Sequence, residues 1–183
     1  IDDLCTDPDK WRNVLRDFPQ LRINLAHFGG YGIWSGNPNQ LQDWRESIAR
    51  LVQDYAHVYT DLSAFENTDD NVRERIGTQL ADFISRFPKL RNRILMGSDW
   101  YMTEAGNLKG VGPYYANEFE LLKIVTENLS GTKFDAWYEF TVVNPLRFIG
   151  LINIEDVEEP EGTLLGVLDE EKTWLDKYWI YIT

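Results

Sequence analysis

Polar side chains stand near the ends of three short apolar stretches of this sequence, and their types could support acid–base or metal chemistry. His27 lies in RINLAHFGG, Asp61 and Ser63 lie in HVYTDLSAF, and Asp99 lies in RILMGSDW. An imidazole and a carboxylate are ligands of zinc-type sites, and the same groups act as general bases. Glycines flank His27 and Asp99, and a glycine lets the backbone turn sharply and approach a ligand closely. His27 and Asp99 are therefore the candidate catalytic and metal-binding residues.

Each of these residues also has a structural interpretation. A histidine at a strand end is often a hydrogen-bonded structural group, and an aspartate there commonly caps the next helix. Asp61 and Ser63 fit the second description, so we interpret them as structural. His57 precedes a strand, and the amino ends of parallel strands serve stability rather than catalysis. The sequence shows no phosphate-binding or dinucleotide-binding glycine pattern, and no Ser or Cys nucleophile in a recognisable turn.

The elements that would position these residues recur along the chain. Short buried strands rich in branched and aromatic residues are expected at 21–28, 57–65 and 93–100. They follow one another at nearly equal spacing when aligned on Ile23, Val58 and Ile94. Amphipathic helices are expected between them. Strands that alternate with helices form a parallel sheet with crossover helices, so the expected fold class is α/β.

The expected helices carry apolar stripes at three- and four-residue spacing. These stripes are Trp11, Val14, Leu15 and Phe18 in 7–18; Leu41, Trp44, Ile48, Leu51, Val52 and Tyr55 in 41–55; Val72, Ile76, Leu80, Phe83, Ile84 and Phe87 in 71–87; and Phe119, Leu122, Val125 and Leu129 in 116–129. Asp7 is expected to cap the first helix, with Pro8 at its first position. In 133–152 we expect a short helix, a break at Pro145, and a final helix that packs Leu146, Phe148, Ile149 and Leu151.

Composition bounds the class of protein. The chain has 183 residues, of which 43% are hydrophobic, and this favours a globular domain over disorder. Its net charge of −12 would repel phosphate backbones, so a nucleic-acid partner is not expected. A single cysteine, Cys5, excludes an intrachain disulfide and a cysteine-based zinc site. No apolar run is long enough to span a membrane and no leader is visible, so we expect a cytoplasmic protein.

The chain divides by composition into two parts. Residues 1–153 hold the three strand–helix units and the closing helices. Residues 154–183 begin acidic and end in the aromatic stretch TWLDKYWIYI, which we expect to include a helix. A tail this apolar is expected to cover a surface on this chain or on another.

Several motifs together resemble the amidohydrolase superfamily. They are W..VL..FP.LRINLAHFGG, then VYTDLS, RILMGSDW and NPLRFIGL, and they span about Pro8 to Leu151. The sequence is most similar to the amidohydrolase-2 group, which includes aminocarboxymuconate-semialdehyde decarboxylase and related acid decarboxylases. The resemblance implies a (β/α)8 TIM barrel in which the three strands are the sixth, seventh and eighth. It implies that His27 is an acid/base or a metal ligand, and that Asp99 binds a divalent metal, expected to be zinc.

The sequence departs from that family pattern upstream. The first-strand His-x-His pair and the fifth-strand histidine have no counterpart here, since the only other histidine is His57. A complete barrel has eight strands in about 250 residues, and this chain supplies three. We therefore expect the carboxyl-terminal portion of such a barrel, completed by an amino-terminal half or by a second copy in a homo-oligomer.

Two function classes stay open at this point. The first is a metal-dependent hydrolase, or a decarboxylase, acting on a small-molecule amide, lactone or carboxylic acid, with this chain supplying part of the active site. The second is a non-catalytic degenerate or half-barrel domain that binds a partner through its open edge and aromatic tail. A small doubly wound α/β domain is a third interpretation, but it does not explain HFGG and GSDW together.

Overall fold

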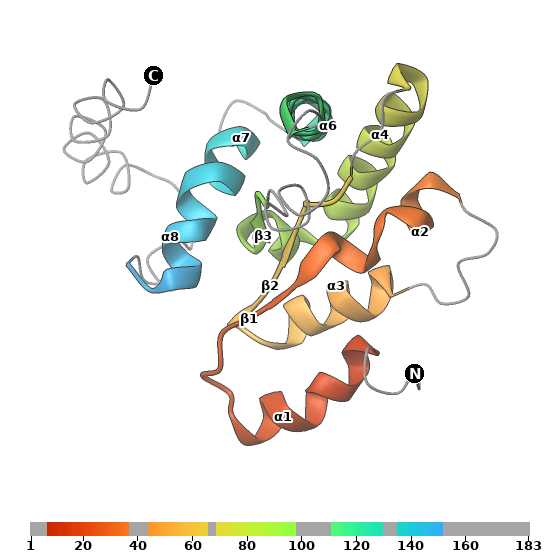
Figure 1. The fold of residues 1–183 in the computed structure, drawn as a ribbon. Coiled ribbons are helices and arrows are strands. Elements are labelled where there is room, and N and C mark those ends of the chain that lie inside the picture. Colours follow the sequence, from red (N-terminus) through yellow and green to blue (C-terminus); the bar gives the residue numbers. More distant parts are fainter. Residues whose placement is uncertain (1–6, 37–43, 66–68, 98–110, 130–134, 152–183) are drawn as a thin grey trace. The chain divides into compact units, whose positions relative to one another are not determined.

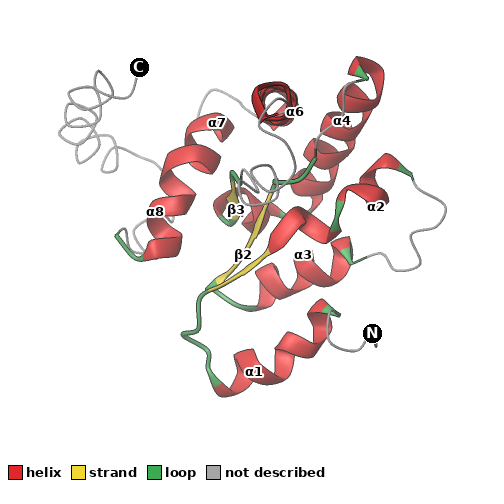
Figure 2. Ribbon diagram, viewed as in Figure 1, coloured by secondary structure: helices red, strands yellow, loops and turns green. Residues whose placement is uncertain are grey.

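The computed structural model describes residues 7–36, 44–65, 69–97, 111–129 and 135–151, and all of them belong to one compact unit (Figure 1). The helices are α1 (Trp11–Asp17), α2 (Tyr31–Ser35), α3 (Arg45–Asp54), α4 (Asp70–Arg86), α6 (Val111–Leu129), α7 (Ala136–Tyr138) and α8 (Asn144–Ile149). The strands are β1 (Ile23–Leu25), β2 (Val58–Asp61) and β3 (Ile94–Leu95). Most of the described chain is therefore helical around a small sheet (Figure 2).

The described strands form one three-stranded parallel sheet in the order β1-β2-β3. This confirms the parallel α/β arrangement, with strands shorter than predicted. Ile23 pairs with Val58 as the sequence alignment suggests, but Ile94 pairs with Thr60 rather than Val58. Equal spacing along the chain fixes the order of the units and not the stagger between strands, since the connecting helix and loops set the register.

The two faces of the sheet pack against different helices. Val58 points into the hydrophobic cluster that contains the buried residues of α3 and α4. Tyr59, the next residue, points to the opposite face, and its ring packs edge-on against Phe148 of α8 at 5.2 Å between centroids. The sheet thus lies between α3 on one side and α8 on the other (Figure 1). Asp61 shares the Tyr59 face because side chains alternate along a strand.

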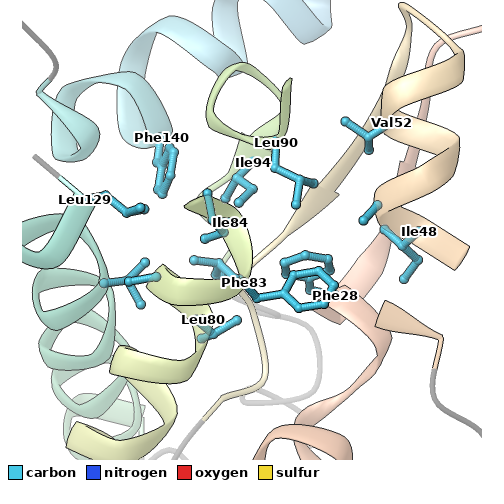
Figure 3. Packing of buried hydrophobic residues seen from close by; sticks show 14 of the residues in the cluster. Phe28, Ile48, Val52, Leu80, Phe83, Ile84, Leu90, Ile94, Leu129 and Phe140 are labelled. Atoms are coloured by element: carbon cyan, nitrogen blue, oxygen red, sulfur yellow. The ribbon is translucent and has the colours of Figure 1, made fainter. Parts of the chain in front are cut away.

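The core lies between the sheet, α3 and α4, and it confirms the two central stripes (Figure 3). The buried stripe residues are Ile48, Leu51, Val52, Ile76, Leu80, Phe83 and Ile84. Trp44, Tyr55, Val72 and Phe87 are partly buried against them, whereas Leu41 lies outside the described residues. Full burial of one such side chain contributes about 1.5–3 kcal/mol, so these two helices fix the sheet in place.

The predicted apolar stripes of α1 and α6 are only partly buried. Asp7 does cap the amino end, since its side chain accepts from the Asp9 amide, but Pro8 begins a 3-10 turn (Pro8–Lys10) that precedes α1. Of the stripe in α1 only Leu15 is buried, and Phe18 is 64% exposed. In α6 the predicted Leu122, Val125 and Leu129 are buried, whereas Phe119 is 43% exposed and Leu121 is buried in its place. A stripe shows that a helix has an apolar face, but not that the neighbours present cover its full width.

The closing helices differ most from the prediction. Pro145 does not break them, because it lies in the first turn of α8, where its missing N–H is not needed, and a π-helical turn (Glu139–Val143) leads into it. Ile149 and Leu151 are exposed, whereas the charged Arg147 is fully buried. The predicted tail over 154–183 lies outside the described residues. No helix within the described ranges has the length and apolar character needed to cross a membrane.

Candidate functional site

The segment after β1 makes a turn with left-handed backbone. His27 and Phe28 have φ of 62° and 40°, and Gly29 and Gly30 continue with φ of 84° and 94°. Glycine adopts such angles freely, but a residue with a Cβ is strained there by about 1–3 kcal/mol. The strain at His27 and Phe28 is therefore offset by other contacts of the same turn.

Burial of the Phe28 side chain fixes this turn to the hydrophobic core. It is fully buried and contacts Trp34 and Phe83 at 5.4 and 5.7 Å between ring centroids. The Trp34 indole N–H donates to the carbonyl of Phe28 at 2.9 Å. With Phe28 anchored in the core, the preceding residue His27 is directed to the carboxyl edge of the sheet.

The carboxylate of Asp61 fixes the same turn through hydrogen bonds at the carboxyl edge of the sheet. It accepts hydrogen bonds from four donors within the described residues: Asn24 Nδ2 (2.5 Å), His27 N (3.0 Å), Ser63 N (3.1 Å) and Ser63 Oγ (2.5 Å). It is 6% exposed. Asp61 therefore does not cap the following helix, as its position at a strand end suggested; α4 is capped by Asp69. Its role is to join the ends of β1 and β2.

The imidazole of His27 lies over this network. Its Nδ1 atom is 2.9 Å from Ser63 Oγ, 3.3 Å from Ser63 O and 4.0 Å from Asp61 Oδ1. The side chain is 39% exposed, whereas that of Asp61 is 8% exposed. His27 thus combines a fixed backbone, a held Nδ1 atom and a ring that solvent can reach, which is the arrangement a proton-transfer or ligand histidine needs.

Gly97 makes room for this network from the end of β3. A Cβ atom placed there would stand 2.7 Å from Ser63 Cβ and 3.3 Å from Asp61 Cγ. The glycine of MGSD therefore permits close packing against Ser63 and Asp61. Asp99, the second predicted site residue, lies outside the described residues.

Helix α6 fixes the residue that follows Ser63. Ala64 has a left-handed φ of 58°, and its amide donates to Glu118 Oε1 at 2.6 Å. Glu118 is 5% exposed. The sequence analysis missed this contact because a glutamate between apolar helical residues is usually a solvated one, and its partner is far away in the sequence.

At the carboxyl edge of the sheet, the described residues do not form a complete set of metal ligands. They include no group of three or more His, Cys, Asp or Glu side chains that could hold a metal ion. Asp61 uses its oxygens for the four donors around it, which leaves His27. A catalytic zinc takes three protein ligands, so this part of the chain does not by itself fit one.

At the amino edge of the same sheet, polar side chains connect the sheet to the helices around it. His57 Nε2 is 2.9 Å from Gln20 Oε1, and burial, with help from Arg22 and Arg93, lowers the pKa of His57. Arg147 Nη1 donates to Glu139 Oε2 at 2.9 Å and to Asn144 Oδ1 at 2.7 Å. This edge joins the closing helices to the sheet, as expected of a structural region.

Asn144 completes that junction. It is fully buried, and its Nδ2 donates to the carbonyls of Arg91 and Ile94 at 2.9 and 2.8 Å. Burial raises the pKa of Glu139, and the nearby Arg147 opposes this rise. The buried polar groups of NPLR therefore bind the start of β3 to α8.

A groove of about 530 Å³ lies apart from both edges, between α2 and α4. Its lining includes Arg45, Arg75 and Arg86, but not His27, Asp61 or Ser63. It is a feature separate from the candidate site.

Comparison with known proteins gives one match. The family model described as amidohydrolase matches residues 6–121, which is more than half of the chain. Those residues include β1, β2, β3 and the whole His27 network. Neither the curated proteins nor the solved structures contain a match.

Proposed function

The chain belongs to the amidohydrolase family, and from this we propose that it contributes part of the active site of a metal-dependent hydrolase. The substrate is a small organic amide, lactone or carboxylic acid. In the hydrolytic case, water adds to the carbonyl carbon, the bond to nitrogen or oxygen breaks, and the leaving group takes up a proton.

The observation that carries this proposal is the placement of His27. In parallel α/β folds, functional groups gather at the carboxyl ends of strands. His27 stands there on a strained turn, fixed by Asp61 and by the burial of Phe28, while its own side chain is 39% exposed. Strained backbone held by surrounding contacts is a feature of functional sites. We propose that His27 moves the proton to or from the reacting group, or serves as a ligand.

We further propose that the three strands are the last three of a (β/α)8 barrel. The parallel order β1-β2-β3 and the crossover helices between them support this. Further strands would then pair with β1 and with β3, the two edge strands of the sheet in the described part of the chain, and would come from another segment or from a second copy. In this arrangement the face that carries Tyr59 and Asp61 belongs to the barrel interior.

The amidohydrolase family generally uses a divalent metal, and we propose zinc for this protein. His27 and Asp99 are the residues of this chain proposed to hold it, together with donors from outside the described residues. When bound, such an ion polarises a carbonyl group and lowers the pKa of water.

The proposal is tested by incubating the purified chain with a panel of small amides, lactones and carboxylic acids, with and without added zinc. We expect release of the acid, amine or carbon dioxide from at least one class, loss of this turnover with a chelator, and recovery with zinc. The same panel is then run on the chain assembled with the segment or second copy that supplies the remaining strands, and a folded, zinc-supplied assembly that turns over no compound would contradict the proposal.

One observation favours the second candidate function, a non-catalytic domain that binds a partner. Large apolar side chains around α1 are exposed: Trp11 (39%), Val14 (38%), Phe18 (64%) and Leu21 (37%). Native mass spectrometry of the chain and of Phe18→Ser tests whether this face joins two copies. A dimer that the substitution dissociates, together with no turnover, would favour the binding domain over the hydrolase.

A further inference from the structure

The neighbours of His27 determine which of its ring nitrogens carries the proton. A backbone carbonyl oxygen can only accept a hydrogen bond. Ser63 O lies 3.3 Å from Nδ1 of His27, so this contact is favourable only when Nδ1 carries hydrogen. The opposite tautomer would set two lone pairs against each other.

The hydroxyl of Ser63 leads to the same conclusion independently. It has one hydrogen to donate, and its oxygen is 2.5 Å from Asp61 Oδ1. A carboxylate that also accepts from Asn24 and from the His27 amide is an acceptor, so the hydroxyl hydrogen points toward Asp61. A lone pair of Ser63 Oγ then faces His27 Nδ1 at 2.9 Å.

Asp61 acts on the ring through Ser63 rather than directly. Its nearest oxygen is 4.0 Å from Nδ1, which is too far for a hydrogen bond. The same carboxylate accepts from the backbone amide of His27, so it fixes both the ring and the main chain that carries it. Gly97 lets this group pack closely, because a Cβ there would stand 2.7 Å from Ser63 Cβ.

We propose that Asp61 and Ser63 are positioning residues that hold His27 in the Nδ1–H tautomer, so that Nε2 keeps its lone pair. Nε2 is then the atom that takes a proton or binds a cation at the carboxyl edge. The use of Nε2 rests on the proposed function, but the tautomer itself does not.

The other histidine provides a built-in control. His57 Nε2 is 2.9 Å from Gln20 Oε1, an acceptor, so His57 is expected in the opposite, Nε2–H form. The two histidines of the chain should therefore give two different patterns in one spectrum.

The test is a two-bond ¹H–¹⁵N correlation spectrum of the full chain with ¹⁵N-labelled histidine, recorded without metal or substrate at about pH 8.5, above the usual histidine range. His27→Asn assigns the signals. For His27 we expect a protonated Nδ1 and an unprotonated Nε2. Ser63→Ala removes the hydroxyl but keeps the Ser63 carbonyl, so we expect it to raise the Nε2–H fraction of His27 without abolishing the Nδ1–H form. Ser63→Thr, which keeps the hydroxyl, restores the wild-type pattern.

Circular dichroism of each variant shows that it is folded. An Nε2–H pattern for His27 in the wild type would overturn the tautomer. An unchanged pattern in folded Ser63→Ala would show that the Ser63 carbonyl holds Nδ1 by itself, and would overturn the positioning role of the Ser63 hydroxyl and Asp61. If Ser63→Ala does not fold, the wild-type spectrum and Ser63→Thr still decide. Because no substrate is present, failure of the tautomer assignment is distinguishable from failure of the proposed hydrolase activity, which the substrate panel measures.

Discussion

The chain's two histidines lie at opposite ends of the same parallel sheet, and their surroundings differ in kind. His57, at the amino edge, has its Nε2 held by Gln20, and its Nδ1 is buried. His27, at the carboxyl edge, has a held Nδ1 and a side chain that is 39% exposed. A network that fixes a residue but leaves its side chain partly exposed differs from a network that only joins elements of the fold. Two polar clusters of similar composition can therefore differ in whether they leave a side chain accessible to solvent.

We expect the largest loss of stability from a substitution at the amino edge of the sheet. Glu139→Ala removes the carboxylate that pairs with Arg147, a side chain with 0% exposure, and leaves a buried charge without its partner. We expect a loss of about 3 kcal/mol in the free energy of unfolding, measured with urea. The control is Glu46→Ala, which removes an exposed pair with Arg50 and should change stability by no more than about 0.5 kcal/mol. Equal effects in the two variants would show that the buried pair is not a structural junction.

A substitution that adds a side chain at the carboxyl edge is expected to have the next largest effect. Gly97→Ala places a Cβ 2.7 Å from Ser63 Cβ, so the network must shift. We expect a loss of about 1–3 kcal/mol from this overpacking and a change in the His27 tautomer pattern.

Gly36→Ala is the matched control for that substitution. Gly36 has a left-handed φ of 77° but no atom within 4 Å of an added Cβ, so only backbone strain of about 1 kcal/mol is expected. The His27 spectrum should stay unchanged. If Gly97→Ala also leaves that spectrum unchanged, the close packing does not position the ring.

The smallest expected effect concerns pH. Burial lowers the folded-state pKa of His57 below its ordinary value of 6.5. Between these two values the unfolded chain binds more protons, so stability falls as pH drops from 6.5 through the folded pKa. His57→Gln should remove this part of the slope in urea unfolding measured from neutral to mildly acidic pH. A variant with the same slope as the wild type would mean that burial of His57 does not contribute to it.

The sequence predicted the parallel sheet and the helices α3 and α4 because periodicity reports burial, and residues such as Ile48 and Leu80 sit where the pattern requires. It did not predict the exposure of Phe18, since an apolar stripe cannot say whether a neighbour covers it. It placed His27 at the carboxyl edge. It interpreted Asp61 and Ser63 as local caps because their actual partners, the backbone and ring of His27, lie in the turn after β1, far away in the sequence. The burial of Arg147 was not predicted, because the sequence around an arginine does not distinguish a buried side chain from a solvated one.

The most direct test of the central claim compares turnover of His27→Asn and His57→Asn on the compound that the substrate panel identifies, with both variants verified as folded. If the carboxyl edge holds the working histidine, His27→Asn lowers kcat about 100-fold or more, because a general acid–base group contributes that much. His57→Asn then stays near the wild-type rate. Wild-type turnover by His27→Asn, or an equal loss in both variants, would contradict the account.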